Sequence, residues 1–104
     1  MDIQLKRGLL EVCALSVLLE EDSYGYKIIK DLEGCITISE STLYPILRRL
    51  ESAGALSVYS AEHNGRLRKY YKITDEGRKK IQDFLDEWKD IMNVYEYIEG
   101  KMKA

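Results

Sequence analysis

The clearest alternation of apolar and polar positions lies between residues 39 and 54. Four apolar side chains fall there at i, i+3, i+4 and i+7, the spacing of one helical stripe. They are Leu43, Ile46, Leu47 and Leu50. The opposite face carries short hydroxyls, a tyrosine and two arginines, without a carboxylate at its centre. The pattern predicts a helix over about 39–53 with one buried face and one face that can donate hydrogen bonds.

The N-terminal segment is more apolar than a one-sided helix needs. Residues 2–20 predict a helix with apolar side chains nearly all round, and a helix that covers a single core needs only one stripe. A second face must therefore be buried, either within the same chain or against a partner subunit. We favour the partner subunit.

A short second helix is expected over residues 24–32, with Gly34 as its stop. Asp22 or Ser23 is the expected cap, because short polar side chains favour that position. Gly25 falls in the first turn, where glycine costs about 0.5–1 kcal/mol relative to alanine. The close approach of another backbone would explain it.

Residues 55–73 have the pattern of a β-hairpin. Asn64-Gly65 is a strong two-residue turn signal, because both residues tolerate the positive φ of a type I′ turn. The turn pairs His63 with Arg66, and apolar partners then meet on one face along both strands. On that face Val58 pairs with Tyr71 and Leu56 with Ile73, and on the other face Tyr59 pairs with Tyr70.

The last segment predicts a helix with an apolar seam. Thr74 is suited to cap it, and apolar residues then recur at alternating steps of three and four, a heptad pattern. So short a chain has little left to cover this seam, so we expect a homodimer whose interface also uses the first helix. The expected interface residues are Leu9, Ile81, Phe84, Trp88, Ile91, Tyr95 and Ile98.

Together these elements predict a mainly α fold with a small β-hairpin wing (α+β). Two helices before a hairpin form a winged helix-turn-helix. Residues 1–73 are the expected DNA-binding domain, with the recognition helix at about 39–53 and the wing at about 55–73. Residues 74–104 are the expected dimerisation helix.

The charge distribution changes how the net charge is interpreted. The 104 residues carry a formal net charge of −2, which at first argues against nucleic acid. Residues 64–80, however, hold seven basic and two acidic side chains. A phosphate backbone responds to this local potential. A solvated hairpin and helix start could carry the same basic block. The block therefore indicates DNA binding only in combination with the predicted recognition helix.

Other function classes lack the residues they need. We find no paired carboxylates on a rigid element, no glycine-rich phosphate loop and no metal-ligand cluster. Cys13 and Cys35 lack partners at metal-ligand spacing, and Cys13 is expected to be a buried structural thiol. We expect no enzyme activity, metal or cofactor. Without a leader or a long apolar run, a cytoplasmic location is expected.

The expected DNA contacts follow from side-chain chemistry. Arginines suit phosphate or guanine, tyrosine suits phosphate or a thymine methyl group, and hydroxyls near a helix start suit phosphate. Arg66 at the wing suits the minor groove. The full set is Tyr24, Lys27, Ser41, Thr42, Tyr44, Pro45, Arg48, Arg49, Asn64, Gly65, Arg66 and Lys69. The alternative is a winged-helix module that binds another protein and never DNA.

Three separated blocks resemble the PadR-type transcriptional regulators. They are YGY at residues 24–26, TLYPILRRLE at 42–51 and GRLRKYYKITDEG at 65–77. The resemblance covers nearly the whole chain, and the single short C-terminal helix is similar to the small subfamily that includes multidrug-responsive repressors. It implies a dimeric winged-helix repressor. Because two recognition helices would read two half-sites, we expect a palindromic operator, and without a long apolar run we expect no membrane partner.

The same resemblance implies a small aromatic ligand that releases the DNA. In the multidrug members a C-terminal tryptophan from each subunit flanks a flat ligand at the dimer interface, and Trp88 stands at the matching place. The implied pocket residues are Leu5, Val12, Leu85, Trp88 and Met92.

Overall fold

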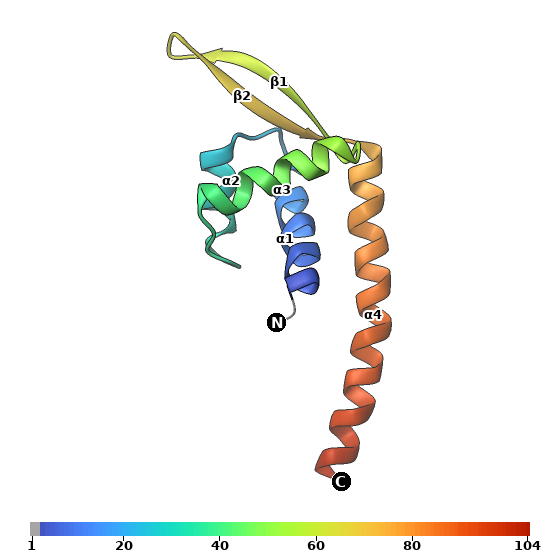
Figure 1. Cartoon of the computed structure of the whole chain (residues 1–104). Coiled ribbons are helices and arrows are strands. Elements are labelled where there is room, and N and C mark those ends of the chain that lie inside the picture. Colours follow the sequence, from blue (N-terminus) through green and yellow to red (C-terminus); the bar gives the residue numbers. More distant parts are fainter. Residues whose placement is uncertain (1–2) are drawn as a thin grey trace.

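A computed structural model describes residues 3–104 of the chain. It confirms a mainly helical fold with one antiparallel hairpin and a long C-terminal helix (Figure 1). Asp2, with which the first helix was expected to begin, lies outside the described residues. The elements are α1 (Ile3–Val17), α2 (Gly25–Leu32), α3 (Glu40–Ser52), β1 (Leu56–His63), β2 (Arg66–Ile73) and α4 (Asp75–Lys103).

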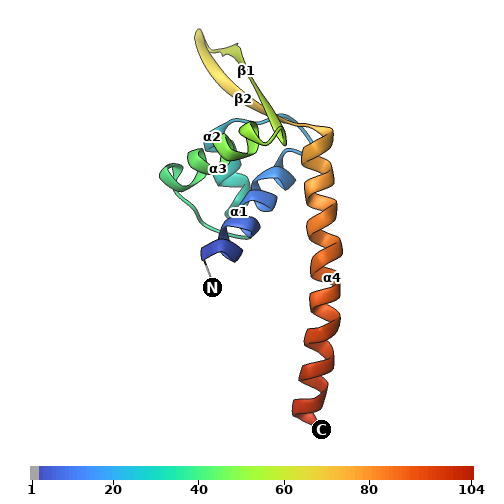
Figure 2. The ribbon, with the colours of Figure 1, turned by 45° about the vertical axis from the view of Figure 1, so that its right-hand side comes forward.

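The core forms where α1, α2, α3 and the base of the hairpin meet (Figure 2). Leu15, Ile28 and Leu43 are fully buried in it. The apolar stripe predicted for residues 39–53 is confirmed, because all four of its side chains are at most 3 % exposed. The polar face of α3 consequently points away from the core.

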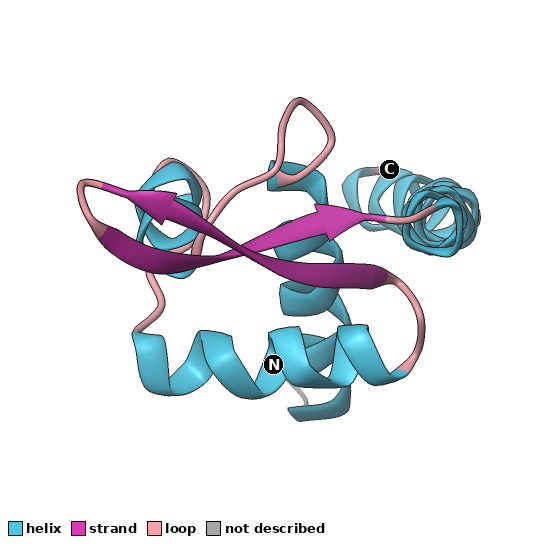
Figure 3. Ribbon diagram, turned by 90° about the horizontal axis from the view of Figure 1, so that it is seen from above, coloured by secondary structure: helices cyan, strands magenta, loops and turns pink. Residues whose placement is uncertain are grey.

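The hairpin has the predicted register. His63 pairs with Arg66 and Leu56 with Ile73. Asn64 and Gly65 have φ values of 52° and 79°, the left-handed conformation that a two-residue turn requires. Seen from the hairpin side, the twisted strands cross over the helices, and α4 appears end-on at one edge (Figure 3).

The first two helices begin or end differently from the prediction. α1 ends at Val17 rather than near residue 20. α2 ends at Leu32 as predicted, but its C-cap is Glu33 and Gly34 does not form the stop. Neither Asp22 nor Ser23 caps α2, because Tyr24 occupies that position and makes no side-chain cap. Ser23 is instead held by backbone hydrogen bonds of 3.1 and 2.7 Å to Tyr71. This contact with the hairpin overrides the local capping preference.

Gly25 is required by a side chain, not by another backbone as expected. A Cβ atom there would fall on the Tyr44 hydroxyl and lie 2.9 Å from its ring Cζ. Glycine thus lets the start of α2 rest against a tyrosine of α3.

In the described part of the chain, α4 packs against the other elements through its N-terminal half. Thr74 caps the helix as predicted, because its hydroxyl accepts a hydrogen bond from the Gly77 amide at 3.1 Å. Gly77 is buried, and a Cβ atom there would fall on the Ala55 carbonyl oxygen and lie 2.7 Å from Ile73 Cγ1. Beyond this anchor α4 extends well past the body of the molecule (Figure 1).

The two cysteines are free thiols, Cys13 on α1 and Cys35 in the turn after α2. Cys13 on α1 is half-buried rather than fully buried, and Cys35 is exposed. Burial raises the pKa of the Cys13 thiol, and the neighbouring Cys35 raises it further. None of the helices among residues 3–104 has the length and apolar character that a membrane crossing needs.

Replacing Gly77 by alanine should destabilise the fold by about 1–3 kcal/mol, because the added methyl group cannot be accommodated against Ala55. Gly100→Ala is the matched control on the same helix. It has open space around it, and alanine should stabilise α4 there by about 0.5–1 kcal/mol. Urea denaturation at one protein concentration measures both changes. Equal midpoints for the two variants would contradict the anchor at Gly77.

Candidate nucleic-acid interface

The polar face of α3 presents several donors at the surface. Ser41, Thr42 and Arg48 are exposed, and Pro45 is half-buried within the helix. The Ser39 hydroxyl, at the N-cap, lies 2.9 Å from that of Ser41 and 3.3 Å from that of Thr42. Three hydroxyl groups therefore gather at the positive end of the helix dipole, where an anion is favoured.

A second polar surface forms where α2, α3 and β2 meet. Tyr24 and Gly25 at the start of α2, Tyr44 of α3, and Arg68 and Lys69 of β2 line a hollow of about 210 Å³. We call this hollow the α2 hollow. It combines a helix N-terminus, tyrosines and two cationic side chains, which is the chemistry that holds a phosphate group. The prediction placed Tyr24, Tyr44 and Lys69 at the interface, and the structure brings these three together.

Arg68 is a candidate that the predicted set lacks. Its guanidinium lies 3.9 Å from the centre of the Tyr24 ring, a cation–π contact. Tyr24 also meets Tyr70 edge-on at 5.9 Å, and Tyr70 stacks on Tyr59 at 5.5 Å. Arg68 shares a strand face with Arg66 and Tyr70, and this two-residue alternation is the sequence signal that could have identified it.

The wing tip lies at the end of the hairpin farthest from α4 (Figure 1). His63, Asn64, Gly65 and Arg66 are all exposed there. Nothing in the described residues covers this turn, so its basic side chain is available to a partner.

Two predicted contact residues are instead engaged with carboxylates. The Lys27 ammonium lies 3.2 Å from Glu21 and 2.9 Å from Asp31, and its hydrogen bonds to these two groups raise its pKa. Arg49 Nε donates to Glu11 of α1 at 3.2 Å. The structure does not bring these two side chains together with the others, and their contact with DNA stays a prediction.

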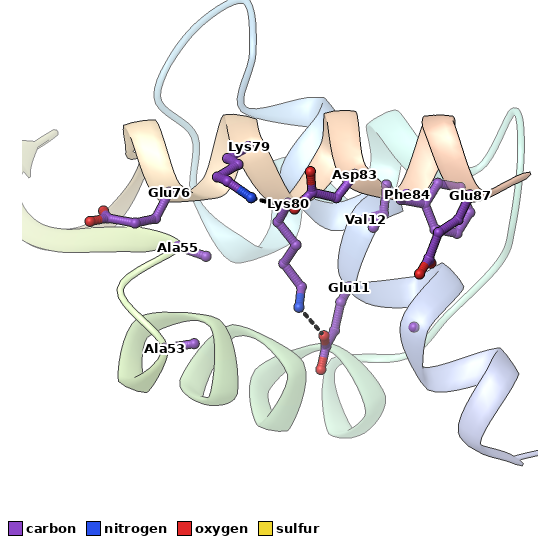
Figure 4. A pocket seen from close by; sticks show the side chains of 11 residues that line it. Glu11, Val12, Ala53, Ala55, Glu76, Lys79, Lys80, Asp83, Phe84 and Glu87 are labelled. Atoms are coloured by element: carbon purple, nitrogen blue, oxygen red, sulfur yellow. Dashed lines mark hydrogen bonds and ion pairs between the residues drawn. The ribbon is translucent and has the colours of Figure 1, made fainter.

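The residues expected around a ligand lie along α1 and α4 but are not all brought together. Val12 lines a cavity of about 470 Å³ between α1, the link from α3 to β1, and the start of α4 (Figure 4). Leu5, Leu85 and Met92 are 41–53 % exposed, and Trp88 is half-buried beside Phe84, with ring centres 5.7 Å apart.

The walls of this cavity are partly acidic, which the sequence pattern did not indicate. Four carboxylates face two lysines there, beside the apolar surface of Val12 and Phe84. The charged residues are Glu11, Glu76, Lys79, Lys80, Asp83 and Glu87.

The expected dimer interface divides into two parts. Leu9, Ile81, Phe84 and Trp88 are half-buried within the single chain, whereas Ile91, Tyr95 and Ile98 are 49–56 % exposed. The second part lies on the portion of α4 that extends beyond the body. Exposed apolar side chains gathered along one helix are typical of a surface that another chain covers.

Solved structures with the same arrangement are known. A Streptococcus mutans protein is 44 % identical, with 90 % of each chain covered and a TM-score of 0.79. A PadR-like transcription factor from Bacteroides fragilis is 35 % identical over 91 % of this chain and 94 % of its own, with a TM-score of 0.81. Bacillus subtilis PadR, solved with operator DNA, shares the fold at 23 % identity and a TM-score of 0.66, over 73 % of this chain and 46 % of its own.

The family model for PadR-like transcriptional regulators matches residues 14–83, which include α2, α3, both strands and the start of α4. The match confirms the resemblance carried by the three sequence blocks and the expectation that the chain is not an enzyme. The chain belongs to the PadR-like family of transcriptional regulators.

Proposed function

We propose that this protein is a dimeric, sequence-specific DNA-binding repressor. The observation that carries the proposal is the exposed polar face of α3, which lies beside the cationic α2 hollow. Bacillus subtilis PadR has been solved with operator DNA, and that family relationship supports the same class of partner here.

The roles of the contact residues follow from their positions. α3 enters the major groove, where Arg48 can hydrogen-bond a guanine edge or a phosphate. The α2 hollow receives a backbone phosphate between the N-terminus of α2 and the side chains of Arg68 and Lys69. Arg66 on the wing reaches toward the minor groove. Residues 1–73 thus bind the DNA.

Residues 74–104 join two copies of the chain. The exposed apolar seam of α4 packs against the seam of a second copy and against its α1, and Leu9 takes part from α1. A twofold dimer presents two α3 helices to two half-sites, so the operator is palindromic, with half-site centres about 34 Å apart.

The dimer interface is also where a small aromatic ligand would act. In this proposal Leu5, Val12, Leu85, Trp88 and Met92 surround the ligand once two chains are together. The cavity beside Val12 supports a site in this region, because it gives a ligand room between α1 and α4. Ligand binding there shifts α4, and with it the two α3 helices, out of register with the half-sites.

Arg48→Ala should weaken binding to the operator by about 1–3 kcal/mol, or roughly 5- to 150-fold, because a direct base or phosphate contact is lost. Fluorescence anisotropy with a labelled operator duplex, titrated between about 50 and 200 mM salt, measures both affinity and salt slope. Lys89→Ala removes one exposed positive charge from α4 and should leave both unchanged. Wild-type affinity that does not depend on salt would favour the protein-interaction module instead.

Ile91→Asp should dissociate the dimer at micromolar concentration, because it places a charge in the centre of the apolar seam. Sedimentation velocity distinguishes the two states. Tyr97→Asp is the control, since Tyr97 is exposed on the opposite face of α4. An Ile91→Asp variant that sediments as a dimer would refute the seam assignment.

A flat aromatic compound that does not bind DNA by itself should quench Trp88 fluorescence and release the operator over the same concentration range. Trp88 is the single tryptophan, so its emission reports on this site alone. Free tryptophan titrated in parallel corrects for absorption by the compound. Trp88→Phe should shift the DNA-release curve to higher concentration; unchanged release would exclude this residue from the ligand site.

A further inference from the structure

Glu11 of α1 holds two basic side chains from two other helices. Its carboxylate lies 3.2 Å from Arg49 Nε of α3 and 3.3 Å from Lys80 Nζ of α4. The Glu11 side chain is only 14 % exposed, and its bond to Lys80 crosses the gap between α1 and α4 (Figure 4). A carboxylate with so little access to water depends on these partners. We call the three residues the Glu11 hub.

The hub is the second of two points at which α4 is tied to the rest of the chain near α3. The first is at its N-terminus, where the Thr74 hydroxyl donates to the Gly54 carbonyl, and Gly77 packs against Ala55. Gly54 and Ala55 directly follow α3. Lys80 lies one turn farther along α4, and through Glu11 it is linked to Arg49 near the end of α3. Ile81 of α4 also packs against the core beside these ties, and the two polar ties add the direct link that orients α4 relative to α3.

We propose that Glu11 sets the angle between α4 and α3, and with it the half-site spacing that the dimer accepts. Arg49 then serves as the link from the hub to α3 and not as a DNA contact. This inference rests on the proposed dimeric DNA-binding function. Glu11 acts through Arg49 and Lys80, so it is a positioning residue.

The length of α4 makes its direction important. About 22 residues separate Lys80 from Met102, which corresponds to roughly 33 Å of helix. A swing of about 5° at the hub displaces the far end by about 3 Å, close to the rise of one base pair. Since the far half of α4 carries the seam, the same swing changes the distance between the two α3 helices.

The two neighbouring arginines of α3 differ in their ion pairing, as the proposed roles require. Arg48 lies on the outer face and forms no ion pair within residues 3–104, so it is available to DNA. Arg49 is turned toward α1 and is neutralised by Glu11. Losing a phosphate contact lowers the salt slope by about one per contact, whereas losing a hub link does not.

The test uses the full-length protein and a palindromic duplex that the wild type selects from a random library. Affinity is measured for that duplex and for versions with one base pair inserted or removed between the half-sites. The wild type should prefer the selected spacing at least tenfold.

Glu11→Gln keeps the shape of the side chain but not its charge, and it should reduce this preference several-fold. Arg49→Gln should do the same at an unchanged salt slope, and the double variant should be no worse than either single variant.

Asp86→Asn is the matched control, because it makes the same carboxylate-to-amide change at an exposed site on α4 away from the hub. It should keep the wild-type preference. Glu11→Gln with wild-type spacing preference would overturn the inference, and so would an Arg49→Gln variant that loses affinity equally at all spacings with a smaller salt slope. If the wild type selects no duplex at all, the proposed function itself fails, and the two failures are thus distinguishable.

Discussion

The amphipathic character of α3 is the constraint on which the rest of the structure depends. One face must be buried firmly enough to hold the helix, while the other stays polar and open. The four buried side chains of the stripe contribute about 1.5–3 kcal/mol each. α1 and α2 supply the surface that covers them, and the hairpin closes the core at its base. The position of the polar face is therefore a consequence of packing on the opposite side.

Close contacts at the ends of elements fix the remaining geometry. Gly25 lets α2 approach Tyr44 of α3, and Gly77 lets α4 approach Ala55 in the link from α3 to β1. The extended residue Ser23 pairs with Tyr71 and ties the hairpin to the link between α1 and α2. The first two contacts connect α3 and its C-terminal link to α2 and α4, and the third connects the hairpin to the link before α2. The proposed DNA-binding elements are therefore held as one unit although they come from separate parts of the sequence.

α4 combines a rigid attachment with an uncovered far half. Its beginning is tied by Thr74, Gly77 and the Glu11 hub, whereas Ile98 and Met102 are 56 % and 83 % exposed. A domain of this size buries only a limited apolar core. Leaving the apolar face of α4 in water would forfeit much of the apolar surface that the chain could bury. In the proposed dimer this surface is covered, and the same helix carries any change at the interface back to α3.

Local patterns in the sequence determined α3, the register of the hairpin and the Thr74 cap, because helical spacing, turn residues and capping all act within a few positions. Contacts between distant residues decided the rest. Neither Glu11 nor Lys80 is near Arg49 in sequence, so no spacing rule could place Arg49 against α1 rather than on the outer face. Likewise, neither Asp22 nor Ser23 caps α2, because Ser23 pairs with the hairpin. The group packed against Gly25 is a side chain from another helix. The sequence by itself determined which elements form and which face of each is apolar, whereas only the tertiary structure decided which charged groups meet, because ion pairs depend on distances that folding alone creates.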